Sequence, residues 1–531
     1  MKRFMIGVVC LISVAGFGAS ARAQQSSLVI GSNQSVSGNG TFTSPGGPQQ
    51  DALRGLDEYI IKSMADWGTP GLSIAIVRDD SVIYAKGYGV RELGKPDRVD
   101  ENTLFAIGSL TKSFTTAALS ILADDGKIRW DDRVTARLPG FRLADPIATE
   151  ELTIRDLASH RSGLPGNNII FWGTSLSRKD IVERVRFLPL TARIRTRFQY
   201  SNLMYVTAGE IIAAVTGKSW DDFTQERIFV PLGMTRSEIG VAALLRSGKP
   251  NVATPHFRPP GGQTAVVPWI DLDNAGPSGS IISSAVDMAQ WLRMQLGKGS
   301  YNGKQIISER MVEEMHSPQM IIPRSANMVA LPGINFVNYG LGWVVHEYHN
   351  SVVVQHGGQT DGMRSIGLIV PEKKIAVVVL TNEALSELPS AIAYNIVDRL
   401  LGGPVQDWST IIYRRMQSPG GGGASSGPQR IEGTRPTLEL ARYAGTYRNQ
   451  MYGDAQVSVR EGALTLQFLG FSVPLQHWHY DTFRIGGTGP FTINGQLITF
   501  SLNRDAEVAF FHIPSAGPAI GIGSFVRVPQ R

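Results

Sequence analysis

The spacing of apolar residues predicts a helix followed by a β-hairpin near the start of the chain. Residues 49–67 carry apolar side chains on one helical face, at Leu53, Leu56, Tyr59, Ile60 and Met64. Two strand-like apolar runs follow, at 72–77 and 82–88, and the polar sequence Arg78-Asp79-Asp80-Ser81 separates them. Polar turn residues between two such runs are typical of a hairpin.

Helical periodicity dominates the middle of the chain, and strand-like runs return near residue 350. The pattern predicts helices over 109–126, 152–157, 205–216, 219–228 and 284–296, then strands at 352–355, 365–370 and 375–380, then a helix at 389–401. This order predicts an α/β (α+β) fold, in which an antiparallel sheet flanked by helices has its first and last strands as neighbours and carries a helical subdomain. We assign residues 51–410 to this domain.

A second, all-β domain is predicted at the C-terminus. Residues 411–436 form a predicted linker, because the stretch 418–428 is rich in Gly, Ser and Pro. Beyond it, apolar side chains alternate with period two at Val457, Val459, Leu464, Leu466 and Phe468. Asn494-Gly495 between two further apolar runs is a strong hairpin signal. Residues 437–531 are therefore predicted to form a small sandwich or barrel.

The first 23 residues have the pattern of a secretory signal peptide. Lys2 and Arg3 precede an apolar run over 4–18, and Ala21-Arg22-Ala23 is a small-residue cleavage site. We predict cleavage after Ala23 and a periplasmic or secreted protein with no stable membrane anchor, since the apolar run is too short to span a bilayer. Residues 24–50, rich in Ser, Gly, Gln and Asn, predict a flexible leader.

Composition excludes several classes of function. Removal of the signal segment takes away three basic residues and no acid, so the formal net charge falls from +6 to +3, which is too little to indicate nucleic-acid binding. The single cysteine, Cys10, lies in that segment, which leaves no thiol nucleophile and no cysteine metal site. The chain also lacks the GxSxG, P-loop, GxGxxG and HExxH motifs, and we predict neither a metal nor a cofactor.

Ser109 and Lys112 are the first candidates for chemistry. They stand three residues apart at the start of a predicted helix, which puts both side chains on one face. A serine hydroxyl becomes a nucleophile when a nearby base takes its proton, and a desolvated lysine can be that base. The pattern alone also fits an ordinary exposed helix, although it is the only S-x-x-K in the chain.

Two further motifs supply candidate partners. Tyr200-Ser201-Asn202 precedes the predicted helix at 205–216, and a tyrosine near a lysine can relay protons while the amide binds a substrate carbonyl. His356-Gly357-Gly358-Gln359 ends a predicted strand. Glycines there let a substrate approach the strand edge, and backbone N–H groups can face a developing oxyanion. A glycine bulge beside a buried histidine is the structural alternative.

Taken together, S-x-x-K, Y-x-N and H-x-G occur in an order and spacing that resembles the serine β-lactamase and penicillin-binding-protein family. The resemblance is to its class C-like branch, which includes esterases and D-aminopeptidases, and it covers roughly residues 50–405. The stretches 152–157, 159–165, 231–234, 280–288 and 339–343 also resemble that family. The C-terminal segment resembles the small lipocalin-like β domain that is appended to some of these hydrolases.

The resemblance implies a catalytic role for four residues. Ser109 would be the acylated nucleophile, and Lys112 and Tyr200 would share the acid and base work. His356 stands where the family usually has the lysine of a K-T-G motif, and it would orient or assist Tyr200. Replacing that lysine removes a fixed positive charge, which disfavours recognition of a β-lactam or D-Ala-D-Ala carboxylate.

The same resemblance implies a set of groups that bind the substrate. Asn202 would hold the substrate amide. The backbone N–H groups of Ser109 and Gln359 would form the oxyanion hole, with Gly357 and Gly358 beside it.

The family also implies the kind of reaction. We expect an exported serine hydrolase that cleaves amide bonds in small or non-standard peptides, such as nonribosomal peptides or those with D-residues; linearised microcystin is the substrate of one family member. The alternatives are a carboxylesterase, a β-lactamase, and a non-catalytic ligand-binding or sensor protein with the same fold. The expected partner is a small peptide or ester, and the sequence does not indicate the oligomeric state.

Three histidines outside these motifs are predicted to be structural. His160 is expected to organise its loop rather than to react. His477 and His479 lie on one face of a predicted strand, but no third metal ligand is apparent beside them.

The sequence does not decide the roles of three other residues. Trp343 either lines the site or packs in the core. Asp361 and Arg364 follow His356 closely and are candidates for contact with the substrate.

Overall fold

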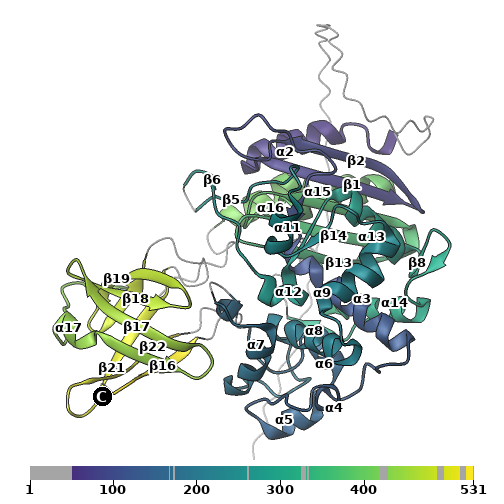
Figure 1. Cartoon of the computed structure of the whole chain (residues 1–531). Helices are drawn as coiled ribbons and strands as arrows, with labels where there is room; N and C mark the ends of the chain where they lie inside the picture. Colours follow the sequence, from purple (N-terminus) through teal and green to yellow (C-terminus); the bar gives the residue numbers. More distant parts are fainter. Residues whose placement is uncertain are drawn as a thin grey trace, which may run out of the picture. The chain divides into compact units, whose positions relative to one another are not determined.

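The fold is described from a computed structural model of the chain (Figure 1). The structure describes residues 51–529 apart from 167, 172–173, 260–261, 324–330, 332–333, 419–428, 487–494 and 515–521. The predicted signal peptide and leader, and the first run of the predicted Asn494-Gly495 hairpin, lie outside the described residues. Within these ranges, no helix is both long and apolar enough to cross a bilayer.

The centre of the first domain is an eight-stranded antiparallel sheet. Its strands lie in the order β10-β11-β12-β13-β14-β15-β1-β2. The first strand, β1 (Gly71–Arg78), pairs with the last, β15 (Ile375–Thr381), which confirms the predicted neighbours. The other strands are β2 (Ser81–Gly89), β10 (Met320–Ile322), β11 (Val337–Tyr339), β12 (Val344–Tyr348), β13 (Ser351–Gln359) and β14 (Arg364–Val370).

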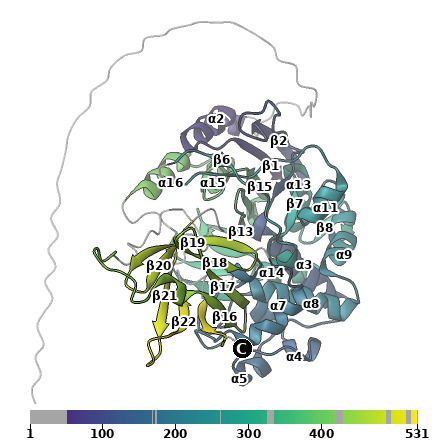
Figure 2. The same cartoon turned by 60° about the vertical axis from the view of Figure 1, so that its left-hand side comes forward.

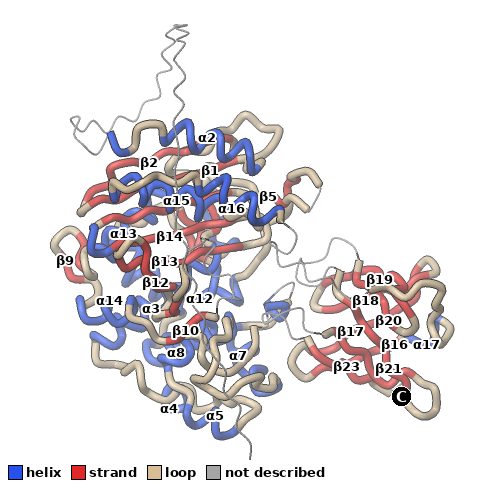
Figure 3. The backbone as a smooth tube through the Cα atoms, turned by 180° about the vertical axis from the view of Figure 1, so that it is seen from behind, coloured by secondary structure: helices blue, strands red, loops and turns tan. Residues whose placement is uncertain are grey.

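Alternating side chains give this sheet two buried faces. Leu72, Ile74 and Ile76 of β1 pack in one cluster with helices α2 (Leu56–Trp67), α15 (Leu388–Leu401) and α16 (Trp408–Gln417). Ala75 and Val77 pack in the other, which includes α3 (Thr111–Asp124) and α13 (Ala285–Leu296). Successive side chains point to opposite faces of a strand, so a strand covered on both sides is apolar throughout. Figure 3 shows these strands in red with blue helices packed around them.

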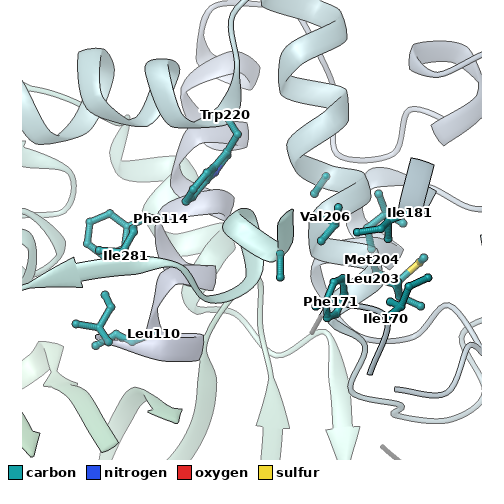
Figure 4. Close-up of a cluster of buried hydrophobic side chains, with 14 of the residues drawn as sticks. Leu110, Phe114, Ile170, Phe171, Ile181, Leu203, Met204, Val206, Trp220 and Ile281 are labelled. Atoms are coloured by element: carbon teal, nitrogen blue, oxygen red, sulfur yellow. The ribbon is translucent and has the colours of Figure 1, made fainter. Parts of the chain in front are cut away.

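The helical subdomain is built around α8 (Asn202–Thr216). This helix packs against α3, α6 (Ile154–Ala158), α7 (Arg178–Arg184) and α12 (Gly276–Gly279). Figure 4 shows two groups of buried side chains in this core, one around Leu110 and Phe114 and one around Leu203 and Met204. The remaining helices include α4 (Val134–Arg137), α5 (Pro146–Glu151), α9 (Trp220–Thr224), α11 (Val241–Ser247) and α14 (Glu309–His316).

The C-terminal domain is a closed barrel whose eight strands follow one another in chain order (Figure 2). Its first strand, β16 (Gly445–Asn449), pairs with its last, β23 (Gly523–Arg527), which closes the cylinder. Leu464, Leu466 and Phe468 point inward, as the period-two pattern predicts. The strands between are β17 (Gly453–Arg460), β18 (Ala463–Phe468), β19 (Phe471–His479), β20 (Thr482–Ile485), β21 (Leu497–Leu502) and β22 (Val508–Ile513). Of the two expected forms, the structure is the barrel.

Several element boundaries differ from the sequence-based prediction. Helix α2 begins at Leu56, after Gly55 in a left-handed conformation, rather than at residue 49. Helix α16 occupies 408–417, so it covers the start of the predicted linker at 411–436, and its Ile412 is buried in the core. The predicted linker therefore starts too early, because only residues 418–428 have the Gly- and Pro-rich composition of a linker. The predicted helix at 219–228 is α9 followed by a π-helical turn at Gln225–Phe229.

One backbone contact between the two parts of the first domain positions the site. A single 3₁₀ turn, η1 (Gly108–Leu110), precedes α3, and Gly108 has a φ of 51°. A Cβ at Gly108 would lie 2.5 Å from the backbone nitrogen of Gln359, and one at Gly358 would lie 1.7 Å from the carbonyl oxygen of Ile107. Both glycines are therefore required by close backbone approach.

We expect Gly358→Ala to destabilise the protein by about 2–3 kcal/mol, because the new methyl group meets a backbone carbonyl that no side-chain rotation can relieve. Gly357→Ala is the matched control, since its Cβ would lie 3.6 Å from the nearest atom, the carbonyl oxygen of Ser365. Thermal denaturation of both variants measures the difference. Equal midpoints would contradict the close approach.

Candidate active site

Ser109 and Lys112 face each other at the start of α3. Ser109 lies in η1, Lys112 lies in the first turn of α3, and Lys112 Nζ is 3.0 Å from Ser109 Oγ. The same Nζ donates a hydrogen bond to the carbonyl oxygen of Ser278 at 2.8 Å. The predicted placement of the pair on one face at a helix start is confirmed. Ser278 belongs to α12, and sequence reasoning missed it because a backbone carbonyl leaves no motif.

Lys112 is completely buried, and this burial sets its protonation state. Removing the ammonium from water lowers the pKa of Lys112 well below its ordinary value of 10.5. None of the carboxylates that the structure describes pairs with this amine. The rings of Tyr200 and Tyr205 lie 4.8 Å and 5.3 Å from Nζ. Such contacts favour the protonated amine by about 0.5–2 kcal/mol, which does not bring the pKa of Lys112 back to its ordinary value. The amine therefore favours the neutral form, which can accept a proton.

Tyr200 lies at the end of the segment before α8, where its hydroxyl interacts with Ser109. Burial raises the pKa of Tyr200 far above its ordinary value, and the hydrogen bond to Ser109 offsets only part of this effect. Tyr200 is therefore a neutral phenol that can pass a proton on. Of the two candidates for the base, burial favours Lys112 and disfavours a Tyr200 phenolate.

His356 lies in β13 and uses both of its ring nitrogens. Its Nδ1 is 2.6 Å from the carbonyl oxygen of Gly357, which requires Nδ1 to carry the proton, and its Nε2 accepts from the hydroxyl of Tyr339 at 2.9 Å. Burial lowers the pKa of His356 to about 3, so the ring is neutral at pH 7. The expected direct assistance to Tyr200 is not seen among the described contacts, since the two rings lie 6.4 Å apart and Tyr339 takes the free nitrogen.

The remaining residues predicted to bind the substrate are Gly357, Gly358, Gln359 and Asn202. Gly108, the residue before Ser109, lies against the backbone of Gln359, the two residues whose N–H groups are predicted to form the oxyanion hole being Ser109 and Gln359. A Cβ at Gly357 would make an ordinary contact, 3.6 Å from the carbonyl oxygen of Ser365. Asn202 is the first residue of α8, two residues beyond Tyr200.

His160 packs against the ring of Tyr200. It is fully buried with a φ of 55°, its ring lies 4.2 Å from the ring of Tyr200, and its Nδ1 accepts from the backbone N–H of Ser201. Trp343 is also fully buried and contacts His316 edge to face, so it packs rather than lines the site. His160 thus organises its loop, as predicted.

The two candidates that follow β13 have different environments. Arg364 donates to the Oε1 of Gln359 at 2.9 Å and pairs with Glu387. Asp361 lines a pocket next to the nucleophile.

The described residues hold no group of three or more His, Cys, Asp or Glu side chains arranged for a metal ion. His477 and His479 lie in β19, where a bulge at Trp478 separates them, and the Nε2 of His477 is 3.0 Å from the carbonyl oxygen of Tyr480. The Nδ1 of His479 accepts from the backbone N–H of Ile431 at 3.4 Å, so both rings have structural partners.

The sheet with its helical subdomain and the buried lysine beside a serine define the class of protein, that of the serine hydrolases with a β-lactamase-like fold. The chain belongs to the beta-lactamase family, whose model matches residues 56–401. A second model, for a domain of unknown function (DUF3471), matches residues 429–521, which form most of the barrel domain.

Similar proteins and structures agree with this assignment. The chain is 29% identical over 430 residues to an unguisins hydrolase, ungD, of Aspergillus violaceofuscus, with 75% of each chain covered. It is 28% identical to penicillin-binding protein 4 of Amycolatopsis lactamdurans, over 59% of this chain and 81% of that one. The octameric penicillin-binding protein homologue from Pyrococcus abyssi has the same fold, with a TM-score of 0.60 and 24% identity over 89% of this chain and 99% of that one.

We expect Lys112→Met to lower kcat/KM by about 10²–10⁴, the usual contribution of a positioned base. Lys127→Met, at an exposed lysine beyond the same helix, is the matched control and should leave kcat/KM unchanged. The pH dependence separates a base from a structural residue. Because the folded-state pKa is lowered, activity rises as the pH rises through that pKa and levels off below 10.5.

The lowered pKa of Lys112 also predicts that the free energy of unfolding depends on pH. The stability that neutral Lys112 contributes is lost as the pH falls from about 10.5 through the folded-state pKa, because the unfolded chain then binds a proton that the folded protein does not. Lys112→Met should lack this pH dependence. An activity profile that is identical in wild type and Lys112→Met would contradict the role of a base.

Proposed function

We propose that this protein is an exported serine hydrolase that cleaves amide bonds in small or non-standard peptides through an acyl-enzyme on Ser109. The observation that carries the proposal is the buried amine of Lys112, 3.0 Å from Ser109 Oγ and without an acidic partner among the described residues. A lysine on an exposed helix would keep its ordinary pKa and could not serve as a base at neutral pH. Export rests on the sequence pattern of residues 1–23.

The proposed reaction has two halves. In the first, Ser109 Oγ attacks the amide carbonyl carbon and its proton passes to Lys112 Nζ; the C–N bond then breaks, and the leaving nitrogen takes that proton through the Tyr200 hydroxyl. In the second, a water molecule attacks the acyl ester, gives a proton to the same Lys112–Tyr200 pair, and the returned proton releases Ser109 Oγ. The backbone N–H groups of Ser109 and Gln359 would stabilise the oxyanion in both halves.

Three considerations favour a peptide amide over the alternatives. The fungal relative that covers three quarters of both chains is named as a hydrolase of unguisins. The solved structures of the same fold include a D-amino acid amidase from Ochrobactrum anthropi, with a TM-score of 0.54 and 24% identity over 70% of this chain and 100% of that one. His356 is neutral, so this position offers a β-lactam carboxylate no positive charge. Linearised microcystin and peptides with D-residues are within the proposed range.

We expect a fluorophosphonate to form one covalent adduct, on Ser109. Ser113→Ala is the matched control, because Ser113 lies in α3, four residues after Ser109, and its hydroxyl donates to the carbonyl of Leu110. This variant should keep the adduct. Ser109→Ala should lose both the adduct and turnover. Intact-mass and peptide mass spectrometry measure the outcome; folded protein that leaves the Ser109 peptide unmodified would refute the covalent mechanism.

A substrate panel decides between amide and ester chemistry. Comparison of kcat/KM for D- and L-aminoacyl amides, linear peptides, p-nitrophenyl esters and nitrocefin should rank peptide amides above nitrocefin. Turnover of esters with no measurable amide cleavage would make the protein a carboxylesterase of the same family. Tight ligand binding with no turnover at all would favour the sensor alternative.

A further inference from the structure

A pocket lies next to the proposed nucleophile, between the end of α12 and the loop after β13. It is a small pocket that is partly open to solvent. Gly279 forms part of one wall, and a Cβ placed there would lie 3.8 Å from the backbone carbon of Gly108. Thr360, directly after Gln359, forms part of another. The pocket is therefore within reach of a substrate held at Ser109.

The lining of this pocket is acidic and apolar. It contains two carboxylates, Asp273 and Asp361, and no lysine, arginine or histidine. Its apolar wall includes Trp269, between Pro268 and Ile270. The pocket therefore repels an anionic group and suits an apolar group that carries a positive charge.

The two carboxylates differ in what they contact. Asp273 accepts hydrogen bonds from the backbone N–H groups of Val241, at 2.9 Å, and Ala242, so it caps the start of α11. Asp361 is partly buried, and no hydrogen bond or ion pair to it is found among the described residues. Its desolvation is not compensated within the described part of the protein.

The basic side chains near Asp361 are committed elsewhere. Arg364 pairs with Glu387 and donates to Gln359. Arg258 lies 3.6 Å from Glu383, close to the segment that carries His256. Both arginines therefore have carboxylate partners other than Asp361.

We propose that this pocket binds a substrate group that carries a protonated amine, which forms an ion pair with Asp361 while its apolar part packs against Trp269. This inference rests on the proposed function, in which Ser109 attacks the neighbouring amide carbonyl. It narrows the substrate class to amides and peptides with a free amine close to the bond that is cleaved. Either an N-terminal α-amine or the amine of a basic side chain has this chemistry.

The test is ligand binding to the Ser109→Ala variant, which cannot turn the ligand over. Leucine amide is compared with N-acetyl-leucine amide for the α-amine, in both enantiomers. N-acetyl-lysine amide is compared with N-acetyl-norleucine amide for the side-chain amine. Calorimetry at about pH 7.5 suits both partners, because burial raises the pKa of Asp361 to about 7 and an α-amine has a pKa of ~7.7–8.0.

We expect the amine-bearing member of one pair to bind about 10–100-fold more tightly, the range for a hydrogen bond to a charged group. Asp361→Asn in the same background should abolish that preference without weakening the acetylated ligand, and Asp361→Glu should retain part of it. Asp273→Asn lines the same pocket and should keep the preference. Loss of the preference in Asp273→Asn alone would assign the effect to the general field of the pocket and overturn the role of Asp361.

Equal affinity within both pairs would overturn the inference. This failure is distinct from failure of the proposed function, which would appear as wild-type protein without Ser109-dependent turnover of any amide or ester. Wild-type turnover that depends on Ser109 but ignores the amine would leave the proposed function intact and refute the amine pocket. The pair that shows the preference identifies the source of the amine.

Discussion

The buried amine of Lys112 is the constraint on which the rest of the site depends. An ammonium without water or a carboxylate is unstable in a protein interior, so the amine remains there only in its neutral form or with compensating dipoles. The structure supplies one such dipole, the carbonyl of Ser278, and the faces of two tyrosines. These groups come from α12 and from the start of α8, so the lysine holds together elements that lie far apart in the sequence.

The neutral side chain of His356 determines much of the charge distribution in the site. A neutral histidine stands where the related enzymes usually carry a lysine, and its two nitrogens are engaged by Tyr339 and by the carbonyl of Gly357. The adjacent pocket adds carboxylates and no base. These groups therefore give a substrate carboxylate no attraction, and the cation nearest to them, Arg364, is already paired with Glu387.

The sequence predicted the elements well and the contacts between them poorly. Apolar periodicity located β1, β15 and α8, because a strand covered on both faces and a buried helix both leave uninterrupted apolar patterns. It also placed Ser109 and Lys112 on one helix face, a local consequence of helix geometry. It did not find Ser278 or the bond between His356 and Tyr339, because those contacts form only when the sheet folds against the helices. The predicted start of the linker was wrong, because the content of glycine and proline does not indicate that Ile412 of α16 packs in the core.

Two kinds of constraint act on this site, and they allow different amounts of change. Gly108 and Gly358 lie against backbone atoms at distances that no side chain tolerates, so the backbone around the proposed oxyanion hole allows little change. Asp361 meets no such requirement, since its carboxylate has no structural partner among the described residues, and Trp269 is only partly buried where it packs against the core. Catalytic geometry is thus held by the backbone, whereas substrate selection lies in side chains that the fold leaves free. A carboxylate without a partner among the described residues, in a pocket beside the proposed nucleophile, is available to a charged group of a ligand.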